Sequence, residues 1–248
     1  MIPQSIEELS ASAQSNNGWY RDYMRGNLPR IGADADLIHG MVSKEHSILD
    51  VGAVPPLLLK LLYDKGFRDL HACDPHVETF NAFFKATNIS YHNIDLIREP
   101  EKMPNRKYGC VVLCEVIEHL GGNLLKAIET VADVIDNKGY FYITTPNLRS
   151  ISGLFSLIRY NSGLASKPRE SVRQQFERLG SENGYFGHLR EYTPREVIVL
   201  VESLGFKLIK QEMQTRYYGQ TRCDKIGAQL EKLIPSWRLF AKYLFQKI

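Results

Sequence analysis

One short stretch near the middle of the chain decides the fold: Val111-Val112-Leu113-Cys114-Glu115-Val116-Ile117-Glu118-His119-Leu120. Its first four residues form an unbroken apolar run, the pattern of a strand buried on both faces. Ionisable side chains follow at i, i+3 and i+4, and a helix beginning at Glu118 and His119 would bring them together with Glu115. Such groups are costly to bury unless they bind something, and open parallel sheets bind ligands at the carboxyl ends of their strands.

Strand and helix patterns alternate on both sides of this stretch. We expect strands at 47–51, 69–74, 89–94, 108–114 and 140–144, and helices at 57–65, 77–86 and 124–135. Pro56 suits the first turn of one helix, and Gly66 suits its C-terminal end. Strands that alternate with helices indicate βαβ units, so the sequence predicts an α/β fold with a parallel sheet and right-handed crossovers.

The N-terminal region precedes this alternation. A helix is expected at 5–25, either continuous or interrupted at Asn16-Asn17-Gly18, and Ser5 and Glu8 have the spacing of a capping box at its start. A second helix is expected at 34–41. Residues 1–45 are therefore predicted to form a helical cap ahead of the main domain.

The second half of the chain holds an insertion and two more strands. Residues 147–187 are rich in Ser, Gly, Asn and Arg and are read as a small helical lid, with helices at 151–159 and 170–179. Thr193-Pro194-Arg195-Glu196 has the residues of a helix start, and that helix would end at Gly205. Strands at 206–214 and 237–245 would pair antiparallel at the sheet edge. The main domain, 46–248, would then hold a seven-stranded, mostly parallel sheet.

Composition and charge are those of an ordinary soluble globular protein. The chain has 248 residues, 44% of them hydrophobic and 24% charged, and its formal net charge of +3 is no argument for nucleic acid. Cys73, Cys110, Cys114 and Cys223 lack the spacing of zinc sites and are expected to be buried and reduced. No signal peptide and no apolar run of the ~20 residues that span a bilayer is visible, so the expected location is cytoplasmic.

A turn after the first expected strand is the kind of place where a nucleotide-like cofactor approaches backbone amides. Asp50 is the second-last residue of that strand, and Gly52 permits close backbone approach. Val54 and Pro56 replace the usual later glycines, and proline supplies no N–H, so a ligand with a pyrophosphate would be held poorly. A plain strand–helix turn explains the same residues.

Two more acids follow the next two strands. Asp74 can accept both hydroxyls of a ribose, or it can cap the helix after Pro75. Asp95 can reach an adenine amino group, or it can be a solvated loop residue. Each motif alone leaves both readings open.

Taken in order, these motifs resemble the class I S-adenosylmethionine-dependent methyltransferase family over about residues 30–214. The most specific parts are the Glu-Val-Ile-Glu-His-Leu segment, the Thr145-Pro146-Asn147 turn, and His188-Leu189-Arg190-Glu191-Tyr192-Thr193. The resemblance implies a Rossmann-like fold and S-adenosylmethionine as cofactor. It assigns cofactor contacts to Asp50, Gly52, Ala53, Asp74, Pro75, Asp95, Leu96 and Glu115. The sequence departs from the family's Gly-rich loop at Val54 and Pro56, although relatives that act on bacterial polysaccharides look similar there.

Two branches carry a further feature. The 3-demethylubiquinone-type O-methyltransferases and the small-RNA 3′-terminal 2′-O-methyltransferases resemble this chain at Glu-x-x-Glu-His. The metal-dependent members imply a divalent cation on Glu115, Glu118, His119 and His188, with Mg²⁺ or Mn²⁺ expected ahead of Zn²⁺ or Fe²⁺. Such an ion would lower the pKa of a substrate hydroxyl. Two alternatives remain: His119 or His188 acts as a metal-free general base beside Glu118, or the group is structural.

The resemblance predicts transfer of a methyl group to a hydroxyl of a small molecule or glycan precursor, as in polysaccharide biosynthesis. An RNA 2′-O-methyltransferase and a non-catalytic methyltransferase-like partner protein are the alternatives. The aromatic residues of 19–25 would close over the ligands or pack as an ordinary helix. The tail, 237–248, would be an edge strand or a membrane-surface segment. Basic side chains of the insertion would meet an anionic substrate or form a solvated face: Arg149, Arg159, Lys167, Arg169, Arg173 and Arg178.

Overall fold

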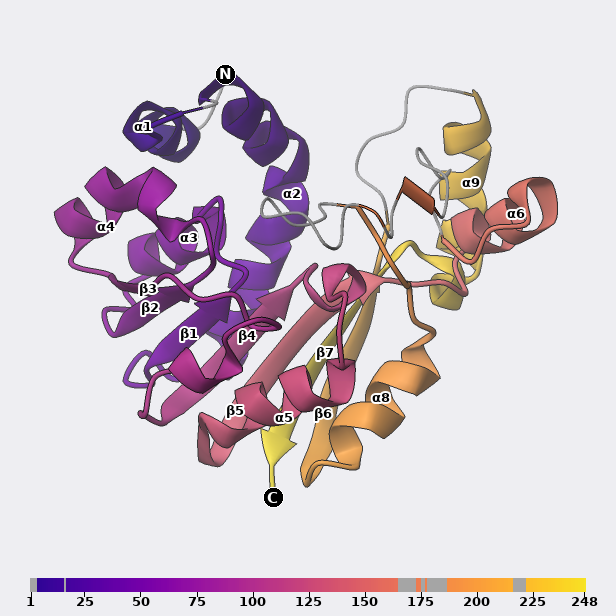
Figure 1. Ribbon diagram of the computed structural model, residues 1–248. Coiled ribbons are helices and arrows are strands. Elements are labelled where there is room, and N and C mark those ends of the chain that lie inside the picture. Colours follow the sequence, from indigo (N-terminus) through magenta and orange to yellow (C-terminus); the bar gives the residue numbers. More distant parts are fainter. Residues whose placement is uncertain (1–3, 16, 165–172, 175–176, 178–186, 216–221) are drawn as a thin grey trace. The chain divides into compact units, whose positions relative to one another are not determined.

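The computed structural model describes residues 4–15, 17–164, 173–174, 177, 187–215 and 222–248 (Figure 1). Two compact units are distinguished by their internal contacts. The first comprises Met1–Leu113, Thr130–Tyr142 and Lys247, and the second comprises Cys114–Glu129, Ile143–Gln246 and Ile248. The division of the chain into a cap at 1–45 and a domain at 46–248 stays a prediction. The expected helix at 170–179 lies largely outside the described residues, as do Lys167, Arg169 and Arg178.

Seven strands form one sheet in the order β3-β2-β1-β4-β5-β7-β6. The strands are β1 Ile48–Val51, β2 Leu70–Cys73, β3 Ser90–His92, β4 Tyr108–Cys114, β5 Ile135–Pro146, β6 Phe206–Gln214 and β7 Phe240–Lys247. In the first unit β1 pairs in parallel with β2 and β4, and β2 pairs in parallel with β3. The prediction of a Rossmann-like, mostly parallel sheet with antiparallel pairing toward one edge is confirmed.

The last strand differs from its prediction in position. β7 begins at Phe240, because Trp237 belongs to a short 3₁₀ helix, η4 Pro235–Trp237. It lies between β5 and β6 in the sheet rather than at the edge. Every side chain of 240–245 is buried, Lys242 included, as expected of a strand covered on both faces. The alternative of a membrane-surface segment in this tail is therefore wrong.

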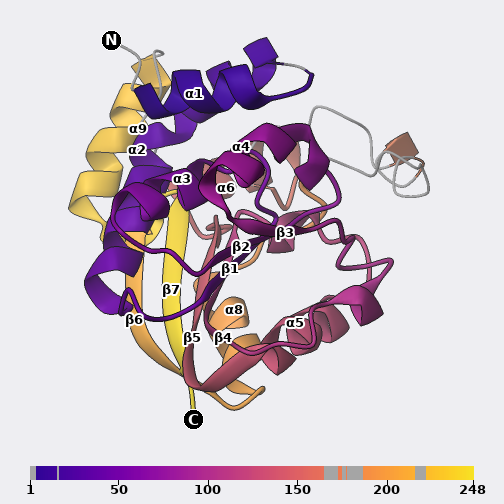
Figure 2. The same ribbon diagram turned by 90° about the vertical axis from the view of Figure 1, so that its left-hand side faces the viewer.

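Helices of the first unit surround its strands. They are α1 Gln4–Ser12, α2 Asn17–Met41, α3 Leu57–Asp64, η1 Val77–Phe80, α4 Asn81–Thr87 and η2 Pro100–Lys102. The helix α1 contacts α2, α3 and α4 (Figure 2). Helix α3 begins after Pro56 and is followed by Gly66 at a φ of 100°, as the sequence predicts. The side chain of Ser5 lies outside the described residues, so the capping box at Ser5 and Glu8 stays a prediction.

Helix α2 corrects the expectation of two separate helices at 5–25 and 34–41. It runs unbroken from Asn17 to Met41 with Pro29 in its interior, where a proline removes one backbone hydrogen bond. Its buried stripe of Met24, Ile31, Ala35 and Ile38 continues on both sides of the proline. Tertiary packing along this stripe offsets the local helix-breaking signal.

Helices of the second unit follow the ends of its strands. They are η3 Ile117–His119, α6 Ile151–Tyr160, α8 Pro194–Glu202, α9 Arg222–Leu233 and η4, and the first part of α5 Leu124–Asp133 belongs here too. The capping box at the start of α8 is confirmed: the Thr193 hydroxyl accepts from the Glu196 amide, and the Glu196 carboxylate accepts from the Thr193 amide. The sequence did not predict α9. Across the described part of the chain, no helix has the length and apolarity to cross a membrane.

The cysteines are unreactive core residues where the structure describes them. Cys73 and Cys110 are buried and Cys114 is half-buried, and these three cysteines are thiols rather than disulfides. Burial raises the pKa of Cys73 to about 12, which keeps this thiol protonated at neutral pH. The prediction is confirmed for Cys73 and Cys110, whereas the side chain of Cys223 lies outside the described residues.

Candidate active site

The stretch after β4 forms one tight turn rather than the start of a long helix. Glu115 has a φ of 59°, in the left-handed region that non-glycine residues seldom occupy, and the chain bends there. The 3₁₀ helix η3 then carries Glu118 and His119 before the chain continues to Leu124, the first residue of α5. We expected a helix to begin at Glu118; the single turn replaces it.

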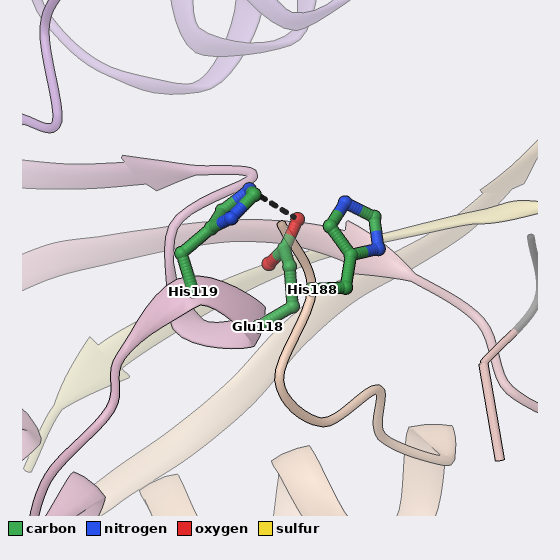
Figure 3. A group of neighbouring side chains, drawn as sticks. All are labelled: Glu118, His119 and His188. Carbon is green, nitrogen blue, oxygen red and sulfur yellow. Dashed lines mark ion pairs between the residues drawn. The ribbon is translucent and has the colours of Figure 1, made fainter. Parts of the chain in front are cut away.

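Glu118 is fully buried in the second unit. Its Oε2 accepts a hydrogen bond of 3.0 Å from the Thr145 hydroxyl. Its Oε1 has no hydrogen-bond partner among the described residues and points toward His119 and His188 (Figure 3). Burial, together with the nearby charges of Glu115 and Glu191, raises the pKa of this carboxyl well above its usual value. A buried carboxyl oxygen without a partner is unusual and marks this residue as a candidate for a functional role.

His119 presents one ring nitrogen toward this carboxylate. Its Nδ1 lies 2.9 Å from the carbonyl oxygen of Gly187, which only accepts, so Nδ1 carries the proton. Its Nε2 lies 3.9 Å from Glu118 Oε1. Burial and the neighbouring His188 lower the pKa of His119 to about 4, so the ring is neutral at pH 7 and the contact with Glu118 is no ion pair there.

His188 is oriented in the same manner from a segment far along the chain. Its Nδ1 lies 2.7 Å from Oε1 of Glu191, and its ring meets that of His119 edge to face at 4.8 Å between centroids. The Leu189 amide donates to the Glu118 carbonyl at 2.8 Å. This backbone hydrogen bond holds the segment of His188 against η3.

Three of the four predicted metal ligands come together. Glu118, His119 and His188 each offer one ligand atom, and these atoms lie within 4.8 Å of one another. Both imidazoles direct Nδ1 to an oxygen acceptor, the arrangement that fixes Nε2 of metal-binding histidines toward the metal. The three residues therefore fit a divalent cation. Glu115 is outside this cluster, and its Oε1 accepts from the Thr144 hydroxyl at 3.1 Å, so its role as a ligand stays a prediction.

The residues predicted to bind the cofactor through the first turn lie in the first unit. Asp50 is buried, and burial with the charges of Asp74 and Asp34 raises its pKa to about 7. Gly52 has a φ of 81° and donates its amide to the Cys73 carbonyl, so the turn requires glycine. Ala53, the next residue, is buried.

Asp74 and Asp95 both bind backbone amides. Asp74 accepts from the amides of Val54 at 3.3 Å and His76 at 2.7 Å, and burial raises its pKa to about 6. Asp95 accepts from the amides of Ile97 and Arg98, the contacts of an ordinary loop aspartate. Pro75 is exposed and Leu96 is buried. Contacts of all these residues with a cofactor stay predictions.

Sequence reasoning missed residues that orient the predicted ones. Thr145 and Glu191 hold Glu118 and His188, and Glu191 could have been found because it follows His188 by three residues. Tyr20 of α2 packs edge to face on Phe80, and the charge of Asp74 acts on its hydroxyl. That contact joins α2 to η1, and no local sequence pattern predicts it.

Comparisons with known proteins place the chain in a family. A family model described as a methyltransferase domain matches residues 17–211. No curated protein matches the chain. Among solved structures, the N-methyltransferase NodS from Bradyrhizobium japonicum WM9, in complex with S-adenosyl-L-homocysteine, is 12% identical with a TM-score of 0.58, and 98% of each chain is covered.

Two further structures share the fold. A putative methyltransferase from Haloferax volcanii, in complex with the Trm112 methyltransferase activator, is 13% identical with a TM-score of 0.62 over 96% of this chain and 97% of that one. An O-methyltransferase family protein from Burkholderia thailandensis is 9% identical with a TM-score of 0.57 over 97% of this chain. The chain spans 62% of the length of the latter protein.

Proposed function

Because the chain belongs to the family of class I S-adenosylmethionine-dependent methyltransferases, we propose that it transfers the methyl group of S-adenosylmethionine to a hydroxyl of a small molecule or glycan precursor. An amine attacks a sulfonium methyl through its lone pair, whereas a hydroxyl needs to lose its proton to become a strong nucleophile. A site that can remove the proton of a hydroxyl, as we propose for Glu118, His119 and His188, therefore supports oxygen as the acceptor atom.

The observation that carries this proposal is the unpartnered Oε1 of Glu118, which faces two imidazoles whose Nδ1 atoms are already engaged. We infer that Glu118, His119 and His188 hold a divalent cation. Bound there, the cation would lower the pKa of the acceptor hydroxyl. Three protein ligands leave further coordination positions for the acceptor.

The donor set also bears on which metal is held. Two imidazoles and one carboxylate suit Mn²⁺, Fe²⁺ or Zn²⁺ better than Mg²⁺, which prefers oxygen ligands. Glu115 would move this preference toward Mg²⁺ if it joined the site. We therefore place Mn²⁺, Fe²⁺ and Zn²⁺ ahead of Mg²⁺, which differs from the order expected from the sequence.

In a metal-free mechanism, a histidine would act as the general base that takes the proton of the acceptor hydroxyl. His119 is a weak candidate, because a base with a pKa of about 4 gains little driving force from taking a hydroxyl proton at pH 7. His188 is the better candidate, because Glu191 orients its ring as a carboxylate orients a catalytic histidine. Sensitivity to a chelator separates the two mechanisms.

Cofactor binding is tested by calorimetry with S-adenosylhomocysteine. We expect saturable binding by the wild type and weaker binding by Asp74→Asn, while Asp64→Asn, an exposed change on α3, leaves binding intact. Absence of binding at millimolar cofactor would overturn the enzymatic proposal and favour a non-catalytic partner protein.

The acceptor is tested by transfer of labelled methyl from S-adenosylmethionine to parallel sets of glycans and nucleotide sugars, small hydroxylated molecules, amines, and RNA oligonucleotides. Label in a hydroxyl of the first two sets, lost on addition of EDTA and restored by Mn²⁺, supports the proposal. Label in amines alone or in RNA alone contradicts it.

A further inference from the structure

Helix α6 turns its apolar side chains away from the protein. Large apolar side chains at five of its ten positions are exposed, with Phe155 at 59% and Ile158 at 85% of their full area; the others are Leu154, Leu157 and Tyr160. Its buried positions hold the small residues Gly153 and Ser156. A surface helix normally has the opposite arrangement, with its apolar stripe facing the core.

This orientation is fixed by close packing. Gly153 lies so near Leu148 that a Cβ atom would come within 2.0 Å of the Leu148 carbonyl oxygen. Ser156, three residues later, is on the same face and is also buried. The Ser150 hydroxyl caps the helix by accepting from the Gly153 amide. A rotation that buried Phe155 and Ile158 would break these contacts, so the apolar face remains outward.

The stretch of sequence that contains α6 carries charge of one sign. From Asn147 to Arg169 the chain has no acidic residue, and its basic residues are Arg149, Arg159, Lys167 and Arg169. Arg149 and Arg159 are exposed just before and at the end of α6. An apolar helical face with an exposed arginine in its last turn, in a segment without acidic residues, matches the boundary of a bilayer with anionic headgroups, where aromatic and aliphatic side chains enter and cationic ones remain in water.

We propose that α6 docks this chain onto the surface of an anionic lipid bilayer. The outer face, defined as Leu154, Phe155, Leu157 and Ile158, enters the lipid, and Arg159 contacts the headgroups. In Figure 1, α6 lies beside α9 within the second unit, and these two helices contact each other. The surface is separate from the cluster of Glu118, His119 and His188, so the proposal stands whatever the reaction.

Vesicle binding of the full chain tests this inference. We expect the wild type to sediment with phosphatidylcholine vesicles that contain phosphatidylserine, and to bind pure phosphatidylcholine more weakly. The double variant Phe155→Glu/Ile158→Glu should bind the anionic vesicles at least about tenfold more weakly. Val199→Glu, the same change at an exposed apolar residue of α8, should bind like the wild type.

Two further measurements keep the outcome interpretable. Thermal unfolding of each variant should match the wild type, because the altered side chains are exposed. Trp emission of Phe155→Trp should shift to shorter wavelength with anionic vesicles, since the new ring leaves water. The proposal is overturned if the wild type does not bind vesicles, or if the double variant binds them as well as the wild type does. It is also overturned if the wild type is a dimer that does not bind vesicles and the double variant is a monomer, because the outer face would then be a dimer interface.

Discussion

The carboxylate of Glu118 is the residue whose surroundings most constrain the chemistry. Thr145 fixes one of its oxygens, and the other faces two imidazoles held by Gly187 and Glu191. A buried polar group is costly unless it is paired, so the orientation of this oxygen is favourable only when something binds it. For the cation that we propose at this oxygen, the supporting hydrogen bonds would carry part of the affinity.

Removal of the Thr145 hydroxyl tests this support. Thr145→Val keeps the side-chain size and deletes the hydrogen bond to Glu118, and we expect affinity for Mn²⁺ to fall about 10- to 100-fold. Thr144→Val is the matched control, because this neighbour is equally buried and bonds Glu115 instead. Equal losses in calorimetry would show that Glu115 also belongs to the site; no loss in Thr145→Val would contradict the assignment of Glu118.

Asp50 makes stability depend on pH. Its pKa is about 7 in the folded chain and near 3.8 when exposed, so the folded state keeps a proton that the unfolded state has lost. This contribution to stability is complete below about pH 4 and is lost as the pH rises toward 7.

Asp50→Asn should remove that dependence. Relative to wild type, the variant should gain stability between pH 5 and pH 8 by at least about 1.4 kcal/mol, the value of one pKa unit. Urea unfolding at both pH values measures the change. A constant difference between the two proteins would show that Asp50 titrates alike in the folded and unfolded states.

Among the elements, α2 and α6 show how packing decides what local sequence leaves open. Helix α2 passes through Pro29 because its buried stripe continues beyond the proline. Helix α6 is held by a glycine against a backbone carbonyl, which places its apolar residues outward. In both helices the tertiary contact overrides the signal that the sequence pattern gives.

Two glycine-to-alanine changes of opposite effect test these contacts. Gly153→Ala should destabilise the protein by about 1–3 kcal/mol, because its methyl group meets the Leu148 carbonyl. Gly32→Ala, in α2, has open space around the new methyl group and should stabilise by about 0.5–1 kcal/mol. Urea midpoints measure both, and a stable Gly153→Ala would mean that α6 is free to move from Leu148.

At the scale of the whole molecule, the alternation of apolar runs and helical patterns predicted the sheet well. The strands β1, β2 and β4 are easy to predict because each is buried on both faces and therefore consists mostly of apolar residues. The position of β7 could not be predicted, since its buried Lys242 and its place between β5 and β6 depend on partners distant in sequence. The sequence also did not predict α9 or the short helix η4, which moves the start of β7 to Phe240.

The candidate site was predicted in composition but not in geometry. Spacing and family resemblance gave Glu118, His119 and His188, which the structure brings together. The positive φ of Glu115, which bends the chain there, is not visible in a sequence motif. The Gly187 carbonyl was also unpredictable, because any residue type supplies the same backbone oxygen.

Calorimetric titration of Mn²⁺ into the chelator-stripped full chain, compared with Glu118→Gln, tests the central claim most directly. Glutamine keeps the size of the side chain and removes its charge. The account predicts one Mn²⁺ per chain for the wild type and at least about tenfold weaker binding for Glu118→Gln. A wild type that binds no Mn²⁺, Zn²⁺ or Fe²⁺, or a variant that binds as tightly as the wild type, would contradict a metal site at Glu118, His119 and His188.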